Sequence, residues 1–217
     1  MISILMPVYN GIEFIEESVK SVLYQTFKEW ELIIGVNGHP ANSDVYKKAL
    51  EISKLDENRI TVIDMIGCKG KSETLNNMLN TAKYSWISLL DVDDIWLPKK
   101  LESQIIYMNM YDVIGTQCKY FGDSNIVPTI PLGDVSNFNF TSVNPIINSS
   151  CLVKKELCYW NSNEMCEDYD LWLRLWKKHN KFFNVNSIEV MHRIHEKSAF
   201  NSKGNNNTVD DLLKKYI

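Results

Sequence analysis

The stretch WISLLDVDD, from Trp86 to Asp94, runs from apolar residues directly into three carboxylates. A short apolar run of this kind is typical of a strand buried on both faces of a sheet. In open α/β sheets, ligands bind beyond the carboxyl ends of the strands. The stretch therefore predicts a central strand whose end carries an acidic ligand site.

Three similar strands precede it, each followed by a helical pattern. The expected strands are residues 2–8 (ISILMPV), 31–36 (ELIIGV) and 59–65 (RITVIDM), and the expected helices cover residues 12–23, 43–55 and 73–82. Repeated βα units predict an α/β fold, with a mostly parallel central sheet and helices on both faces, in a single compact domain. The strand ends at Tyr9, Asn37 and Asp91 should then meet at one crevice.

The second half of the sequence is less regular. We expect helices over residues 97–110 and 168–179 and a strand over residues 149–153. Residues 123–144 are polar and interrupted by proline and glycine, a pattern typical of a functional loop. The asparagine-rich segment near residues 201–207 indicates a mobile tail, followed over 210–217 by a last helix or the start of a further segment.

Composition limits the classes of protein that the chain can represent. The 217 residues are 45% hydrophobic, and 23 basic against 27 acidic residues give a net charge of −4. Nucleic-acid binders usually carry a basic excess, so we expect no nucleic-acid partner. Five scattered cysteines without a CxxC pair indicate free thiols in a reducing compartment, which favours a cytoplasmic location. No apolar run approaches the ~20 residues of a membrane span.

The acidic cluster Asp91, Asp93 and Asp94 favours a cation site. Neighbouring carboxylates repel one another unless a positive charge neutralises them. Oxygen ligands suit Mg²⁺ or Mn²⁺, which are typically held by one or two carboxylates and the phosphates of a substrate. Two alternatives stay open on these residues: a solvated acidic turn that caps the next helix, and the Asp-x-Asp motif of a haloacid-dehalogenase-like phosphatase, which usually follows a first strand.

Two further groups of residues carry possible chemistry. Glu167 and Asp168 open a predicted helix, where the helix dipole alone favours carboxylates, but one of them could also serve as a general base. In the segment His192–His195, strand alternation places His192 and Ile194 on one face and Arg193 and His195 on the other. Histidines in such a segment are more often surface or core residues than ligands.

Taken in order, these segments resemble the GT-A-fold inverting glycosyltransferases of family 2. The resemblance covers roughly residues 1–200 and rests on the order and spacing of its parts. The matching segments are residues 4–11 (ILMPVYNG), 18–27 (SVKSVLYQTF), 30–34 (WELII), 70–76 (GKSETLN), 90–101 (LDVDDIWLPKKL), 144–150 (NPIINSS), 167–174 (EDYDLWLR), and Arg193, His195 and Ser198.

The resemblance implies a role for each matching residue. Residues 1–98 would form a nucleotide-sugar-binding half that ends in the Asp-x-Asp motif, and residues 99–200 an acceptor and catalytic half. Asp168 would be the catalytic base, and Asp93 with His195 would hold Mn²⁺ or Mg²⁺. The nucleotide would be bound by Pro7, Tyr9, Asn37, Lys71 and Asp91.

The expected reaction is a metal-dependent transfer, with inversion, from a nucleotide-diphosphate sugar to a hydroxyl group of a glycan or another acceptor. UDP is the expected nucleotide, although Asn37 stands where the family often has a carboxylate. Leu75 replaces an arginine common in the family, which leaves phosphate contacts to Lys71. The alternatives are a nucleotidyl- or phosphoryl-transfer enzyme on a similar sheet, and a nucleotide-sugar-binding module without activity.

Overall fold

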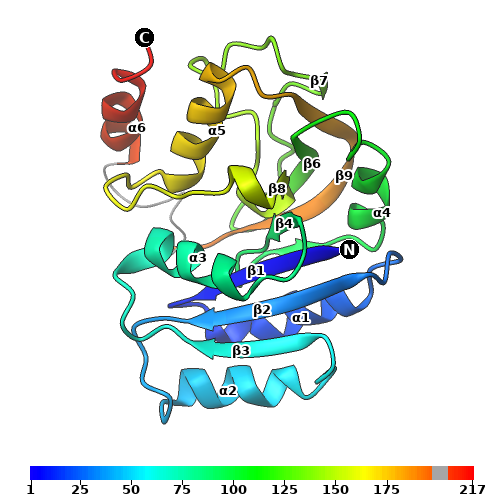
Figure 1. The fold of residues 1–217 in the computed structure, drawn as a ribbon, viewed down its shortest axis with the longest axis vertical. Coiled ribbons are helices and arrows are strands. Elements are labelled where there is room, and N and C mark those ends of the chain that lie inside the picture. The colour runs from blue at the N-terminus through cyan, green and yellow to red at the C-terminus, as the bar shows by residue number, and fades with distance from the viewer. Residues whose placement is uncertain (197–204) are drawn as a thin grey trace.

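The computed structural model of the protein describes residues 1–196 and 205–217 (Figure 1). Ser198 and residues 201–204 lie outside the described residues. The strands are β1 (Ile2–Val8), β2 (Trp30–Val36), β3 (Ile60–Asp64), β4 (Trp86–Leu89), β5 (Ile95–Trp96), β6 (Val113–Gly122), β7 (Gly133–Asp134), β8 (Leu152–Lys154) and β9 (Phe182–Ile194). The α-helices are α1 (Ile15–Leu23), α2 (Asp44–Ser53), α3 (Gly70–Thr81), α4 (Lys100–Ile105), α5 (Glu167–Lys177) and α6 (Asn205–Leu213).

All nine strands join one sheet, in the order β3-β2-β1-β4-β8-β6-β9-β5, with β7 paired to β9. The first four are parallel, with β1 between β2 and β4. β8 joins the two halves by antiparallel pairing with β4 and β6, and β6 runs parallel to β9. The predicted α/β fold is confirmed, and the sheet is continuous between the two predicted halves.

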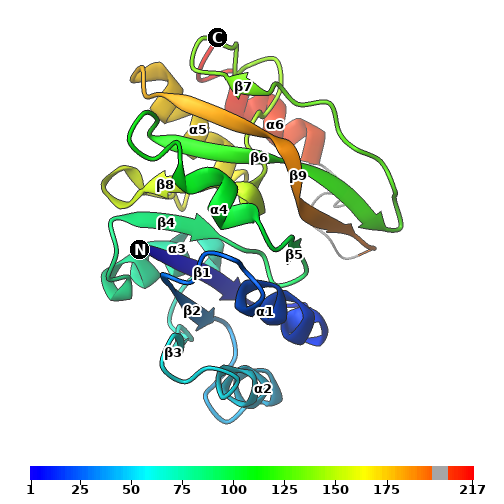
Figure 2. The same cartoon turned by 90° about the vertical axis from the view of Figure 1, so that its right-hand side faces the viewer.

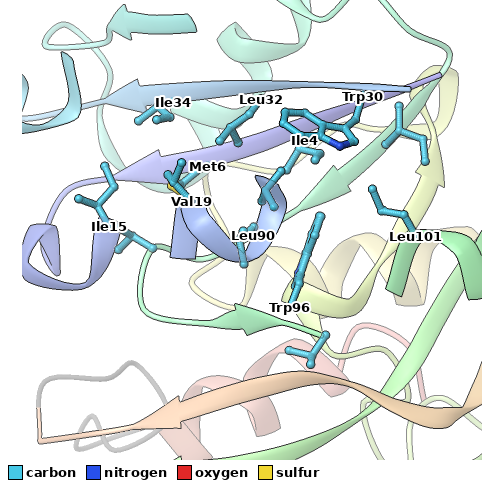
Figure 3. Packing of buried hydrophobic residues seen from close by; sticks show 14 of the residues in the cluster. Ile4, Met6, Ile15, Val19, Trp30, Leu32, Ile34, Leu90, Trp96 and Leu101 are labelled. Atoms are coloured by element: carbon cyan, nitrogen blue, oxygen red, sulfur yellow. The ribbon is translucent and has the colours of Figure 1, made fainter. Parts of the chain in front are cut away.

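Helices cover both faces of the sheet because the side chains of β1 alternate between two cores. Ile4 and Met6 face one core, where α1 packs through Ile15 and Val19 (Figure 3). Leu5 faces the other core, which contains the apolar side chains of α3 and α5. A strand buried on both faces reads as a continuous apolar run, which is why the sequence pattern identified β1, β2 and β4.

Several predicted boundaries differ from the structure. α3 begins at Gly70 rather than at residue 73, and the helix expected over residues 97–110 is limited to Lys100–Ile105. The strand expected at 149–153 is β8, Leu152–Lys154, preceded by a short 3-10 turn. The strand β6, which the sequence analysis missed, is buried although it contains Thr116 and Gln117, because side chains and loops satisfy these polar residues.

The C-terminal segment contains a last helix, one of the two possibilities that the sequence left open over residues 210–217. Residues 205–213 form α6, Leu212 is buried, and the Tyr216 hydroxyl donates a 2.8 Å hydrogen bond to Asp170 of α5. Figure 2 shows α6 beside α5.

Across the described residues, no helix has the length and apolarity that crossing a membrane requires. All five cysteines are free thiols, as the sequence predicted.

Candidate active site

A pocket of about 580 Å³ opens where β1, β2 and β4 end. Six of the residues predicted to bind the donor or its metal line it: Pro7, Tyr9, Asn37, Lys71, Asp91 and Asp93. They meet because parallel strands place their carboxyl ends along one edge of the sheet. The volume lies in the range of natural small-molecule sites.

An aromatic side chain and a glycine form one wall of this pocket. Gly38 has φ +73°, and a Cβ at this position would come within 2.3 Å of the Tyr9 ring. Only glycine combines this backbone conformation with such a close approach. Tyr9 is 56% exposed, and its carbonyl lies 2.6 Å from Nε2 of His39. The His39 ring also contacts the Tyr9 ring, with centroids 5.6 Å apart, so the exposed Tyr9 ring lines the pocket between Gly38 and His39.

Each carboxylate of the acidic cluster has its own partner in the protein. Asp91 accepts hydrogen bonds from Lys71 (2.7 Å) and from the amide of Asn148 (2.8 Å). Burial alone would raise the pKa of Asp91, but the Lys71 ammonium outweighs it and holds this pKa below its usual value. Asp91 is therefore neutralised within the protein by Lys71, so a cation at the acidic cluster is not needed to compensate its charge.

The third carboxylate, Asp94, is structural. It is fully buried and accepts hydrogen bonds from the Arg193 backbone N–H (2.8 Å) and from His192 Nδ1 (2.9 Å). Burial lowers the pKa of His192, but the negative charge of Asp94 outweighs this and raises it to about 9. His192 is therefore protonated at neutral pH. Its pairing with Asp94 fixes the end of β9 to residues 91–94, the acidic loop.

The acidic loop contacts residues of His192–His195 that strand alternation had placed on opposite faces. Arg193 Nε donates to the carbonyl of Asp93 (2.8 Å), and His195 Nε2 lies 2.9 Å from Asp93 Oδ2. β9 ends at Ile194, so His195 follows the strand and strict alternation no longer applies to it. Ser149 Oγ accepts a hydrogen bond from the Asp91 backbone N–H (3.1 Å). The sequence analysis assigned no site role to His192, Asn148 or Ser149, although His192 lies in the segment His192–His195 and the other two lie in the segment 144–150, both of which it had singled out.

Asp93 and His195 fit a divalent cation. The two side chains are 23% and 24% exposed. Burial, together with the charges of Asp94 and Asp91, raises the pKa of Asp93, so a bound cation would relieve an unfavourable charge. The described residues contain no group of three or more potential ligands. Mg²⁺ is typically held by one or two carboxylates together with substrate phosphates, and Asp93 supplies one such carboxylate.

Asp168 lies in the first turn of α5 and is half-buried. The N-cap of this helix is Cys166, so Asp168 does not cap it. Burial and the neighbouring charge of Glu167 raise the pKa of Asp168 to about 6. Lys71 Nζ lies 3.3 Å from the Glu167 carboxylate and 2.7 Å from Asp91. The predicted base and the predicted donor pocket are therefore neighbours.

The geometry agrees with a family comparison. The family model "Glycosyl transferase family 2" matches residues 3–170, which is most of the chain. The protein belongs to glycosyltransferase family 2. One relative is the Escherichia coli UDP-Glc:alpha-D-GlcNAc-diphosphoundecaprenol beta-1,3-glucosyltransferase WfaP, 28% identical over 210 residues that cover 94% of this chain and 81% of that protein. This glycosyltransferase is thus an enzyme of the class that the sequence predicted.

Two solved structures share the fold. Staphylococcus aureus TarS in complex with UDP-GlcNAc matches with a TM-score of 0.76 and 16% identity, over 93% of this chain and 60% of that one. Mycobacterium tuberculosis glucosyl-3-phosphoglycerate synthase, in complex with Mn²⁺, UDP and phosphoglyceric acid, matches with a TM-score of 0.67 and 14% identity, over 98% of this chain and 78% of that one. These matches establish the GT-A fold.

Proposed function

We propose that this family 2 glycosyltransferase is metal-dependent and inverting, and that it transfers a sugar from a nucleotide-diphosphate donor, UDP-linked, to an acceptor hydroxyl group. The observation that carries the proposal is the convergence of the six predicted donor-site residues in one pocket beside Asp168. The UDP-linked donor is supported by WfaP, whose name specifies UDP-Glc, and by the UDP complexes of the two structural relatives.

Each residue of the pocket has a role that its chemistry suits. The Tyr9 ring is placed to stack on the base of the nucleotide. The amide of Asn37, which is 4% exposed, both donates and accepts hydrogen bonds, as the edge of uracil requires. Asp91 would accept from a nucleoside hydroxyl, and Lys71 would approach the phosphates. Asp93 and His195 would hold Mn²⁺ or Mg²⁺, which supplies positive charge to the diphosphate leaving group when bound.

Asp168 is the proposed base. An acceptor hydroxyl is a weak nucleophile at neutral pH, and a carboxylate within hydrogen-bond reach raises its reactivity by taking its proton, with an effect of roughly 10²–10⁴-fold. With its pKa raised to about 6, Asp168 is ionised at neutral pH and still a better proton acceptor than an ordinary aspartate. Direct attack on the anomeric carbon, from the face opposite the diphosphate, gives inversion without a covalent intermediate.

A donor screen tests the proposal. The protein is incubated with Mn²⁺, a panel of nucleotide sugars and simple sugar acceptors, and release of nucleoside diphosphate is measured. We expect nucleoside diphosphate as the product and loss of release with a chelator. Release of pyrophosphate or inorganic phosphate would instead indicate nucleotidyl or phosphoryl transfer, and product of the same anomeric configuration as the donor would contradict inversion.

A further inference from the structure

One lysine lies between the donor pocket and the helix that carries the proposed base. Lys71 Nζ lies 2.7 Å from Asp91 Oδ1 and 3.3 Å from Glu167 Oε1. The side chains of Lys71, Asp91 and Glu167 are 35%, 22% and 14% exposed, so water screens these ion pairs only in part. The two carboxylates come from separate elements, the acidic loop after β4 and the first turn of α5.

The backbone that carries Lys71 is itself fixed on the segment before α5. Asn76 of α3 donates from its amide to the Trp160 carbonyl (2.7 Å) and accepts from the Trp160 backbone N–H (3.0 Å). Ser72 adds a 3.3 Å hydrogen bond to the Asn161 carbonyl. The start of α3 therefore has a defined position relative to α5, and the lysine is directed at its two carboxylates rather than free in solvent.

We propose that Lys71 is a positioning residue for the reaction: its single ammonium joins Asp91 of the donor pocket to Glu167, and thereby holds the neighbouring Asp168 in place and in its ionised form. The inference rests on the proposed role of Asp168 as the base. This role goes beyond the phosphate contact that the sequence predicted for Lys71. A phosphate contact alone would not require the second ion pair, between Lys71 and Glu167.

The charges around Asp168 support this role. Burial raises its pKa, and so do the carboxylates of Glu167 and, more weakly, Asp91, whereas the Lys71 ammonium lowers it. The other titratable groups that interact with Asp168 are Tyr169 and the thiols of Cys166 and Cys151, whose own pKa values are raised. Lys71 is thus the cation that opposes burial and the acidic neighbours at this position.

The proposal is tested by measuring how turnover depends on pH at a saturating donor concentration, in two variants for which we expect opposite shifts of the pH profile. Lys71→Met removes the cation, so the midpoint of the acidic limb of the kcat profile should move up by about one pH unit. At pH 6.5 this shift corresponds to a roughly threefold loss of kcat. Glu167→Gln removes a neighbouring negative charge, so the limb should move down by a similar amount. Lys71→Arg should keep the wild-type limb, and Lys69→Met, at an exposed lysine two residues away, should change nothing.

The outcomes separate this inference from the proposed function. If the wild-type enzyme turns over and Asp168→Asn does not, the base is established independently of Lys71. A Lys71→Met variant that only weakens UDP binding in calorimetry, with the limb unmoved, would overturn the inference and leave Lys71 as a phosphate contact. A folded Glu167→Gln variant that loses turnover at every pH, while Asp168→Asn keeps turnover close to that of the wild type, would assign the base to Glu167 and overturn both proposals.

Discussion

Asp93 carries the least compensated charge of the acidic cluster, and this determines what its removal should do. Asp93→Ala should weaken Mn²⁺-dependent UDP binding at least roughly tenfold, because the variant lacks one of the two proposed protein ligands. The melting temperature should stay equal or rise, since burial and the charges of Asp94 and Asp91 disfavour the ionised form. Calorimetry with and without chelator measures the first effect, with the exposed Glu57→Ala as control. Wild-type affinity in Asp93→Ala would contradict the metal assignment.

The proposed base, Asp168, should also carry a cost in stability. We expect Asp168→Asn to lower kcat by roughly two to four orders of magnitude while UDP binding stays near the wild-type value. Because the folded state raises the pKa of Asp168 to about 6, its ionised form destabilises the fold at pH 7, and asparagine should raise the melting temperature. Turnover close to that of the wild type would show that the base lies elsewhere.

At the scale of elements, the contact of α5 with the C-terminal segment depends on one buried carboxylate. Asp170 is 2% exposed and accepts hydrogen bonds from Arg174 Nε (2.7 Å) and the Tyr216 hydroxyl (2.8 Å). Asp170→Ala leaves both donors unpaired and should lower the free energy of unfolding by about 3 kcal/mol. Urea unfolding measures this, and Asp211→Ala at an exposed ion pair, which water screens, should cost much less. Equal losses would contradict a structural role for the Asp170 contacts.

At the scale of the whole molecule, the buried Lys100 links global stability to pH. Its ammonium donates to Ser88 Oγ (2.7 Å) and lies 3.8 Å from the Trp96 ring centroid, and burial lowers its pKa to about 7. In the unfolded chain Lys100 has a pKa near 10.4, so above pH 7 the unfolded state keeps a proton that the folded state loses. The free energy of unfolding should therefore rise with pH above 7.

Lys100→Met removes this linkage. Between pH 7 and pH 9, the free energy of unfolding should increase by up to about 2–3 kcal/mol more in the wild type than in the variant. Urea unfolding at the two pH values measures the difference, and the exposed Lys99→Met is the matched control. The same pH dependence in the wild type and in Lys100→Met would contradict a neutral lysine in the core.

The residues at strand ends could be predicted because they depend on local pattern alone. An apolar run followed by polar residues identifies a buried strand and its end, and parallel pairing places Tyr9, Asn37 and Asp91 at one edge. The same reasoning failed for β6, where the polar Thr116 and Gln117 interrupt the apolar pattern. The Thr116 hydroxyl donates to the neighbouring Gln117 carbonyl, whereas the Gln117 amide donates to the carbonyl of Pro128, eleven residues away.

The sequence by itself determined the α/β fold and predicted that the ends of β1, β2 and β4 meet at one edge of the sheet, and the family pattern supplied the proposed roles of Asp93 and Asp168. Only the tertiary structure decided how the charges are paired. Asp94 meets His192 from 98 residues away, Asp93 meets His195 from 102 residues away, and Lys71 reaches both Asp91 and Glu167. The physical reason is that strand and helix patterns report on neighbours within a few residues, whereas the ionisation of a buried carboxylate depends on every charge within a few ångströms, whatever its position in the chain.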